Sequence, residues 1–230
     1  MDTKLLFLED AYRKEFETSV LKYENGYAIL DQTCFYPRSG GQECDKGIIE
    51  RDGEIFNVSE VKKEKGTVLH KINGVLNEGD KVSGKIDWDR RYKMMKYHTA
   101  LHILSRVIFD MYGGGVTGND ISPNRARMDF DLEKIEDKEE IEKRTNEIIK
   151  EGRDVKIYTV PREEAEKLVD EKTRLDMIPH FVKEIRLVEI ENFDIDACGG
   201  THVKNTKEIG EIKITKIENK GKGRKRIVIV

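Results

Sequence analysis

The chain has 230 residues, of which 37% are hydrophobic and 38% charged, so it can bury one good-sized core or two small ones. No aliphatic run approaches the ~20 residues of a membrane helix, and the N-terminus resembles neither a signal nor a transit peptide. A net charge of -3 excludes a protein that coats nucleic acid by bulk charge, and three cysteines argue against a disulfide framework. We therefore expect a cytoplasmic globular protein, with neither a membrane nor DNA as a partner.

Short apolar segments separated by turn pairs occupy the N-terminal part of the chain. Asn-Gly and Asp-Gly pairs between such segments are typical of β-hairpins, and their spacing predicts a small β-barrel. The predicted strands cover residues 27–30, 47–49, 54–58, 67–70 and 81–86, with turn pairs at Asn25-Gly26, Asp52-Gly53 and Asn73-Gly74.

The pattern changes near Trp88, where apolar residues begin to recur at a helical period. The spacing predicts a long helix from Arg90 to Tyr112, so we expect a β-barrel domain over 1–88 and a second domain over 89–230. The second domain alternates helices and strands, which indicates an α+β fold in which the long helix packs on an antiparallel sheet in two layers. Strands are predicted at 127–132, 154–160, 184–190, 210–217 and 226–230, with helices at 137–152 and from Pro161.

Two short motifs carry potential metal ligands. His98 and His102 stand four residues apart in the predicted helix, so both imidazoles would share one face. Alone, such a pair is as often two packing residues, and the Glu that follows the first His in zinc proteases is missing. Cys198 and His202 flank a Gly-Gly pair that can bend the backbone tightly. Three imidazoles and one thiolate suit zinc, the alternative being an inert buried thiol beside packing histidines.

Three other polar residues, two histidines and one aspartate, are not predicted to be metal ligands. His70 and His180 have no partner at ligand spacing, and we interpret both as structural. Asp196 stands two residues before Cys198 and could orient a ligand imidazole, although a surface acid is the simpler interpretation.

A basic run extends from Lys204 to Arg226. It is densest at a predicted hairpin tip, where it could contact RNA phosphates, and a solvated charged turn is the alternative. The predicted tRNA-binding residues are Lys220, Lys222, Arg224, Lys225 and Arg226. Arg90, Arg91, Lys93 and Lys96, at the start of the long helix, are expected to extend the patch.

A third segment, Phe35-Tyr36-Pro37-Arg38-Ser39-Gly40-Gly41-Gln42, contains two glycines that permit close backbone approach. Alone it predicts an ordinary hairpin loop. Together with His98-Thr99-Ala100-Leu101-His102 and Cys198-Gly199-Gly200-Thr201-His202, it resembles the editing domain of alanyl-tRNA synthetase and its freestanding relatives, the AlaX family. The resemblance extends over nearly the whole chain. Neither an aminoacylation domain nor a long coiled coil flanks the motifs, and in this respect the chain resembles the medium-length class of the freestanding AlaX proteins.

The resemblance implies roles for individual residues. The two His and the Cys/His motifs would bind one zinc ion per chain. Gly40, Gly41 and Gln42 would approach the same cleft and the tRNA from the first domain. Thr117, beyond the long helix, would contact the serine hydroxyl of the substrate.

An aminoacyl ester is already activated, so its hydrolysis needs a positioned water and a polarised carbonyl. Gln42, Thr99 or a backbone amide could place that water. Four protein ligands would fill a tetrahedral site, as in structural zinc sites, so the sequence leaves open whether the metal activates water or only orients substrate.

We therefore predict a zinc-dependent deacylase that hydrolyses Ser-tRNA(Ala) in trans, with Gly-tRNA(Ala) as an open second substrate. The main alternative is a noncatalytic tRNA-binding module stabilised by zinc. A general zinc esterase for small molecules is a weaker third hypothesis, which would show no dependence on RNA or salt.

Overall fold

The computed structural model describes residues 2–230, which divide into two compact units, one ending at Met94 and the other comprising Met95–Val230. The expected α+β class is confirmed. The division falls inside helix α2 (Trp88–Tyr112), whereas the predicted boundary lies at the start of that helix. None of the helices in the described part of the chain is long and apolar enough to span a membrane.

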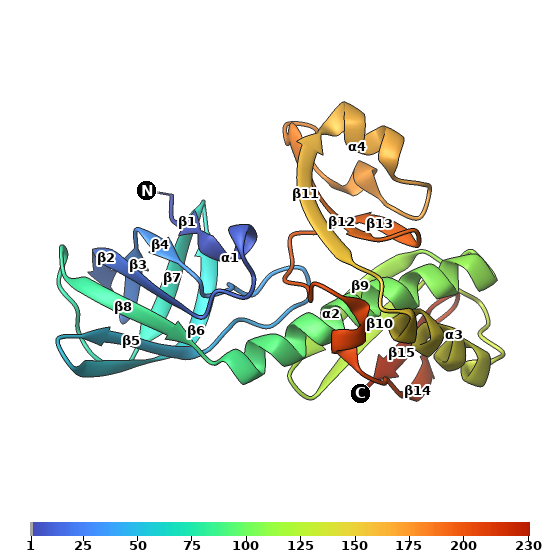
Figure 1. Cartoon of the computed structure of the whole chain (residues 1–230), viewed down its shortest axis with the longest axis horizontal. Coiled ribbons are helices and arrows are strands. Elements are labelled where there is room, and N and C mark those ends of the chain that lie inside the picture. Colours follow the sequence, from blue (N-terminus) through green and yellow to red (C-terminus); the bar gives the residue numbers. More distant parts are fainter. Residues whose placement is uncertain (1) are drawn as a thin grey trace. The chain divides into compact units, whose positions relative to one another are not determined.

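The first unit contains a closed barrel with the strand order β2-β3-β7-β6-β5-β8 (Figure 1), which confirms the predicted barrel. Strand β2, which was not among the predicted strands, is part of it. Outside the barrel, β1 (Lys4–Leu5) pairs in parallel with β4 (Gln32–Thr33), and α1 (Leu6–Glu9) follows β1. The barrel strands are β2 (Glu15–Glu24), β3 (Tyr27–Leu30), β5 (Gly47–Arg51), β6 (Glu54–Glu64), β7 (Thr67–Ile72) and β8 (Lys81–Ile86).

Three of the barrel hairpins close through two-residue turns. Asn25-Gly26 and Asp52-Gly53 have positive φ at both positions, 52° and 82° in the first and 50° and 84° in the second, as type I′ turns require. Lys65-Gly66 forms the same turn between β6 and β7. The predicted turn at Asn73-Gly74 is wrong as a hairpin, because β7 pairs with β3 and β6 while the next strand, β8, pairs with β2 and β5.

The barrel core follows from the alternation of side chains along its strands. Every second residue of β8 is buried, and β2 buries Phe16, Thr18 and Val20 in the same way. The large side chains Phe16, Phe35, Leu30, Ile49, Phe56 and Val61 fill the interior.

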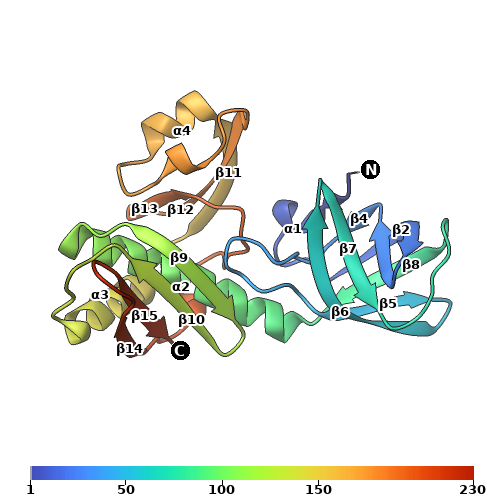
Figure 2. The same ribbon diagram turned by 180° about the vertical axis from the view of Figure 1, so that it is seen from behind.

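The second unit contains two antiparallel sheets instead of one. The four-stranded sheet has the order β14-β15-β10-β9 and the three-stranded sheet the order β11-β12-β13. Figures 1 and 2 show α2 along the four-stranded sheet, in front of it in one view and behind it in the other. The strands are β9 (Val116–Ser122), β10 (Arg125–Phe130), β11 (Val155–Pro161), β12 (Glu184–Ile190), β13 (Asp194–Ala197), β14 (Ile214–Asn219) and β15 (Lys225–Ile229).

Helix α2 is the central element of the second unit. From His98 to Ile108, every residue except Arg106 is buried, so the helix is covered on nearly all sides. The predicted helix over 137–152 is also present as α3 (Lys138–Glu151). Asp137 caps its first turn by accepting from the amide of Glu140 at 2.9 Å, and Gly152 ends it with φ 74°. The remaining helices are α4 (Arg162–Leu168), η1 (Leu175–Met177) and η2 (Thr206–Ile209).

Candidate metal centre

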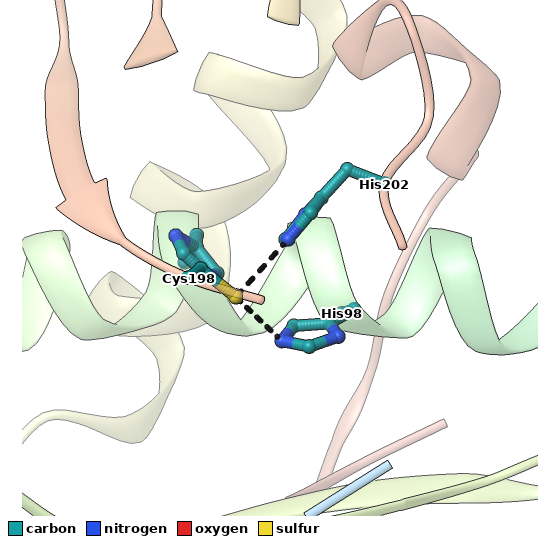
Figure 3. Close-up of side chains that lie close together, drawn as sticks. His98, Cys198 and His202 are labelled. Atoms are coloured by element: carbon teal, nitrogen blue, oxygen red, sulfur yellow. Dashed lines mark hydrogen bonds between the residues drawn. The ribbon is translucent and has the colours of Figure 1, made fainter. Parts of the chain in front are cut away.

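Two segments of the second unit bring His98, His102, Cys198 and His202 to one point. One potential ligand atom from each residue lies within 4.8 Å of the others. His98 and His102 are one turn apart on α2 and therefore project from the same face. Figure 3 shows the rings of His98 and His202 directed at the sulfur of Cys198, which lies 3.4 Å from Nε2 of each. The structure thus brings together the four side chains of the two motifs.

The backbone around Cys198 fixes the position of its thiol. The amide of Cys198 donates to the carbonyl of Arg186 at 3.2 Å, and the guanidinium of Arg186 donates to the carbonyl of Cys198, so the residue is tied to strand β12. The chain then turns sharply, and the amide of Gly200 donates to the Cys198 sulfur at 3.3 Å. A Cβ on Gly200 would lie 2.0 Å from Cε1 of His98, so this close approach requires glycine.

Thr99 determines which nitrogen of His202 is available. Its hydroxyl donates to the carbonyl of Met95 at 3.1 Å and lies 3.2 Å from Nδ1 of His202. Because the hydroxyl proton is engaged with the carbonyl, the Thr99 oxygen accepts from Nδ1–H, which leaves a lone pair on Nε2. The amide of Val203 donates to the same oxygen at 3.3 Å. Thr99 is fully buried and therefore orients a potential ligand.

Burial keeps all four side chains uncharged when no cation is near. It lowers the pKa of His98 and of His202 well below the usual value for imidazole, and it lowers the pKa of His102 to about 4, where Asp196 partly opposes it. Burial also raises the pKa of the Cys198 thiol to about 11, against the opposing effect of the Gly200 amide. A divalent cation would displace the thiol proton and meet imidazoles that are already neutral.

One unsatisfied atom in the cluster fits such a cation. Nδ1 of His102 is buried and has no hydrogen-bond partner among residues 2–230. A buried polar atom without a partner needs an explanation, such as an ion. Imidazole and thiolate donors together suit a borderline-soft divalent metal. The four residues therefore form a group that can hold a metal ion.

The loop with the two glycines lies in the first unit. Ser39 and Gln42 exchange backbone hydrogen bonds of 3.2 and 2.9 Å across a tight turn in which Gly40 and Gly41 have φ 54° and 80°. Positive φ angles of this kind favour glycine, which adopts them without a steric cost. Gly40 is exposed, whereas Gln42 is buried. Because Gln42 belongs to one unit and the four potential ligands to the other, their approach stays a prediction.

A buried ion pair that sequence reasoning missed anchors this loop. Arg91 and Asp45 are paired with both side chains fully buried, and Arg91 also donates to the carbonyls of Ala11 and Cys34. The amide of Tyr36 donates to the same carboxylate at 2.7 Å. The prediction that Arg91 belongs to an exposed basic patch is therefore wrong. Arg91 stands three residues before Met94 and therefore on the apolar face of α2, and this spacing could have predicted that it is buried.

Thr117 lies at an irregularity of the edge strand β9. Asp129 and Phe130 are consecutive on β10, yet they pair with Gly118 and Val116, so Thr117 is the extra residue of a β-bulge. Its side chain is exposed. The bulge aims Thr117 away from the regular ladder, which sequence alone did not predict.

The predicted basic hairpin is confirmed as the turn between β14 and β15, but its cations differ in their partners. Arg226 forms two bonds of 2.6 and 2.7 Å with Asp129, and Lys220 lies 2.9 Å from Glu218. Lys225 donates to the side chain of Asn219. Lys222 and Arg224 are exposed and have no ion-pair partner in the part of the chain that the structure describes.

Comparison with known proteins gives consistent similarities. Residues 2–90 match the family described as tRNA synthetases class II (A), and residues 185–228 match the threonyl and alanyl tRNA synthetase second additional domain. The alanyl-tRNA editing protein AlaX-M of Saccharolobus solfataricus is 48% identical over 229 residues, covering 98% of this chain and 97% of that protein. AlaX-M of Methanosarcina barkeri is 45% identical over 236 residues, with coverage of 98% and 97%. The alanine–tRNA ligase of Pyrococcus furiosus is 39% identical over 99% of this chain but only 26% of the ligase.

Proposed function

Because this chain belongs to the family of AlaX-M alanyl-tRNA editing proteins, we propose that it hydrolyses Ser-tRNA(Ala) in trans, at a zinc site formed by His98, His102, Cys198 and His202. Alanyl-tRNA editing breaks an aminoacyl ester bond, so the protein is an enzyme of the hydrolase class. Its partner is tRNA(Ala), which we propose is mischarged with serine or glycine and is met in the cytoplasm. The observation that carries the proposal is the convergence of four potential ligands from segments ~100 residues apart.

Zinc at this position would polarise the ester carbonyl and stabilise the negative charge that develops on its oxygen. The chain contributes the arrangement of the ligands. Thr99 holds the His202 ring with its Nε2 lone pair toward Cys198, and Gly200 leaves room for the His98 ring. Thr99 is therefore a positioning residue in this proposal, because its hydroxyl is fully engaged with Met95, His202 and Val203.

Gln42 is our candidate for placing the attacking water. A buried amide offers both a donor and an acceptor without a charge, which suits an ester that needs orientation and no strong base. The tight turn at Gly40 and Gly41 supports this role, because glycine has no side chain and a bound substrate could approach the backbone of the turn closely.

Thr117 is our candidate for recognising the serine hydroxyl. Its exposed position at a β-bulge supports the assignment, because bulges re-aim side chains beside active sites. A hydroxyl that bonds the serine side chain would lose that bond when alanine is present, so Ala-tRNA(Ala) would be spared.

The hairpin between β14 and β15 is our candidate for contact with tRNA phosphates. Lys222 and Arg224 support it best, since both are exposed and unpaired among residues 2–230. Arg226 is committed to Asp129, so its contribution to RNA binding would be smaller.

A deacylation assay with Ser-tRNA(Ala), Gly-tRNA(Ala) and Ala-tRNA(Ala) tests the proposal. We expect serine to be released much faster than in buffer, alanine to be retained, and activity to disappear with a chelator and return with zinc. Release of serine at the buffer rate, with one metal ion bound per chain and tRNA affinity intact, would instead support a noncatalytic module. The complete set of four protein ligands favours that second candidate, because structural zinc sites are closed in the same way.

A further inference from the structure

A buried cluster of charges lies beside His102. Lys172, on the segment between α4 and η1, places its ammonium nitrogen 3.0 Å from Asp194 and 2.7 Å from Asp196. The Lys172 side chain is 3% exposed and that of Asp194 is 1% exposed. Lysine is almost never buried so deeply without a specific partner. The cluster therefore needs an explanation within the fold or the site.

Asp196 is the most tightly held member of this cluster. Its Oδ2 binds Lys172, while its Oδ1 accepts from the hydroxyl of Thr173 at 3.1 Å and from the amide of Ala197 at 2.9 Å. The side chain is 26% exposed, so the expectation of a simple surface acid is wrong. Bonds on both oxygens fix the carboxylate in one orientation.

This carboxylate faces one of the potential metal ligands. One ligand atom each of His102, Asp194 and Asp196 lies within 4.8 Å of the other two. The ammonium of Lys172 already bridges the two carboxylates, so a cation is built into this position. Asp194 and Asp196 therefore lie beside His102, and the ammonium of Lys172 neutralises part of their negative charge.

The segment that carries Lys172 is also tied to α2. Lys172 Nζ lies 3.5 Å from the hydroxyl of Ser105, and that hydroxyl donates to the carbonyl of His102 at 2.8 Å. The Thr173 hydroxyl also lies 3.1 Å from the carbonyl of Ile195 on β13, so its single proton is shared between that carbonyl and Asp196. The cluster thus connects the helix that supplies two potential ligands with the strand that leads to Cys198.

We propose that Asp196, anchored by Lys172 and Thr173, is a positioning residue of the metal centre that strengthens cation binding by His102. This inference rests on the proposed metal site. A divalent ion bound by three neutral imidazoles and one thiolate keeps a charge of +1, and the Asp196 carboxylate is the negative charge that faces His102, with Lys172 and Arg186 as the opposing cations. Bringing these opposite charges together in a buried site stabilises the metal-loaded form, and Asp196 acts without touching substrate.

The test is the metal affinity of Asp196→Asn, measured by competition with a chromophoric chelator for zinc and cobalt. The substitution preserves shape and removes the charge, so we expect affinity to fall about 10–100-fold. The absorption spectrum of the cobalt-loaded protein should also shift, because the His102 environment changes. Asp176→Asn is the matched control: Asp176 is paired with Arg174 at 2.9 Å but is 63% exposed, and the change should leave affinity and spectrum unaltered.

A second variant separates this role from a purely structural one. Thr173→Val keeps the Asp196 charge and removes one of its anchors, so we expect a smaller loss of affinity, of a few-fold, with the metal-free protein still folded. Unchanged affinity and spectrum in both variants would overturn the inference. If the unaltered protein itself binds neither zinc nor cobalt, the proposed metal site is wrong. If the parent and Asp196→Asn bind the metal equally well, the site stands and only the role of Asp196 is wrong.

Discussion

The two units each bury histidine, and the contrast between His70 and His102 shows how a structural imidazole differs from a potential ligand. Both are buried, and burial lowers the pKa of each to about 4. In the barrel, Nδ1 of His70 donates to the carbonyl of Ala28 at 3.1 Å, and Nε2 accepts from the hydroxyl of Thr33 at 2.9 Å. In the second unit, Nδ1 of His102 has no partner among residues 2–230.

The difference teaches that hydrogen-bond satisfaction, and not burial, separates the two environments. His70 has its proton and its lone pair both engaged, so nothing more is needed for its stability. The centroid of the His102 ring lies 5.5 Å from that of His98 and 4.7 Å from that of His202, and in our proposal a cation supplies the missing partner of this cluster. The following predictions test this contrast.

Cys198→Ala should have the largest effect. Loss of a ligand should lower metal affinity by more than about 100-fold, since even outer partners of metal ligands contribute 10–100-fold. The thiol has a pKa of about 11 and is neutral without metal, so the metal-free fold should tolerate alanine. Chelator competition, deacylation of Ser-tRNA(Ala) and tRNA filter binding would show lost metal, lost activity and retained RNA affinity.

Cys34→Ala is the matched control for this substitution. Cys34 is also a buried free thiol, but it lies in the barrel, so its replacement should leave metal binding and activity unchanged. Unfolding of the metal-free Cys198→Ala protein, with Cys34→Ala intact, would contradict the prediction and support a metal that only staples the domain.

Gly200→Ala should have the next largest effect. The new methyl group would lie 2.0 Å from Cε1 and 2.4 Å from Nδ1 of His98, so the ring must leave its position. We expect metal affinity to fall about 10–100-fold, as for other changes that misorient a ligand. Gly199→Ala provides the control, because no heavy atom lies within 4 Å of a Cβ there. Equal affinities of the two variants, measured by chelator competition, would mean that His98 is not held as described.

His70→Gln should change how stability depends on pH. The folded pKa of about 4 is below the ordinary value of 6.5, so the native state favours neutral imidazole and loses stability as pH falls from 6.5 toward 4. Protonation of His70 in the unfolded state should lower the free energy of unfolding by about 2 kcal/mol between pH 7 and pH 5. Glutamine keeps hydrogen-bonding capacity but does not titrate, so denaturant unfolding of His70→Gln should lack this loss. His180→Gln, at an exposed position, should behave like the parent; equal pH profiles of all three proteins would contradict the assignment.

The same contrast explains how much could be predicted from the sequence. Short apolar segments separated by turn pairs predicted the barrel, and the periodicity from Arg90 predicted α2, because these are local patterns. The spacing of the His and Cys/His motifs identified four side chains that do converge. Local patterns could not place β13, because the four residues Asp194–Ala197 are too few to show a period and form a strand through pairing with β12.

The missed polar interactions are long-range for the same reason. Lys172 meets Asp194 and Asp196 across more than twenty residues, and Arg91 meets Asp45 across 46. In the sequence, each of these residues looks like a surface charge, because burial of a charge depends on a partner that only the fold supplies. Thr99 likewise looked like a candidate for placing water, whereas the fold engages its hydroxyl with His202 and Met95.

The smallest expected effect extends the contrast between satisfied and unsatisfied groups to surface charge. Lys222→Ala with Arg224→Ala removes two cations that have no ion-pair partner within residues 2–230, so tRNA affinity should fall several-fold. The slope of log affinity against log salt should decrease by about 1.4 to 1.8, as expected for two lost phosphate contacts. Lys143→Ala with Arg144→Ala removes the same charge from α3, where both cations already bind Glu140, and should leave the slope unchanged. If filter binding at several salt concentrations gave both double variants the same slope, the hairpin would contribute bulk charge and no specific contact.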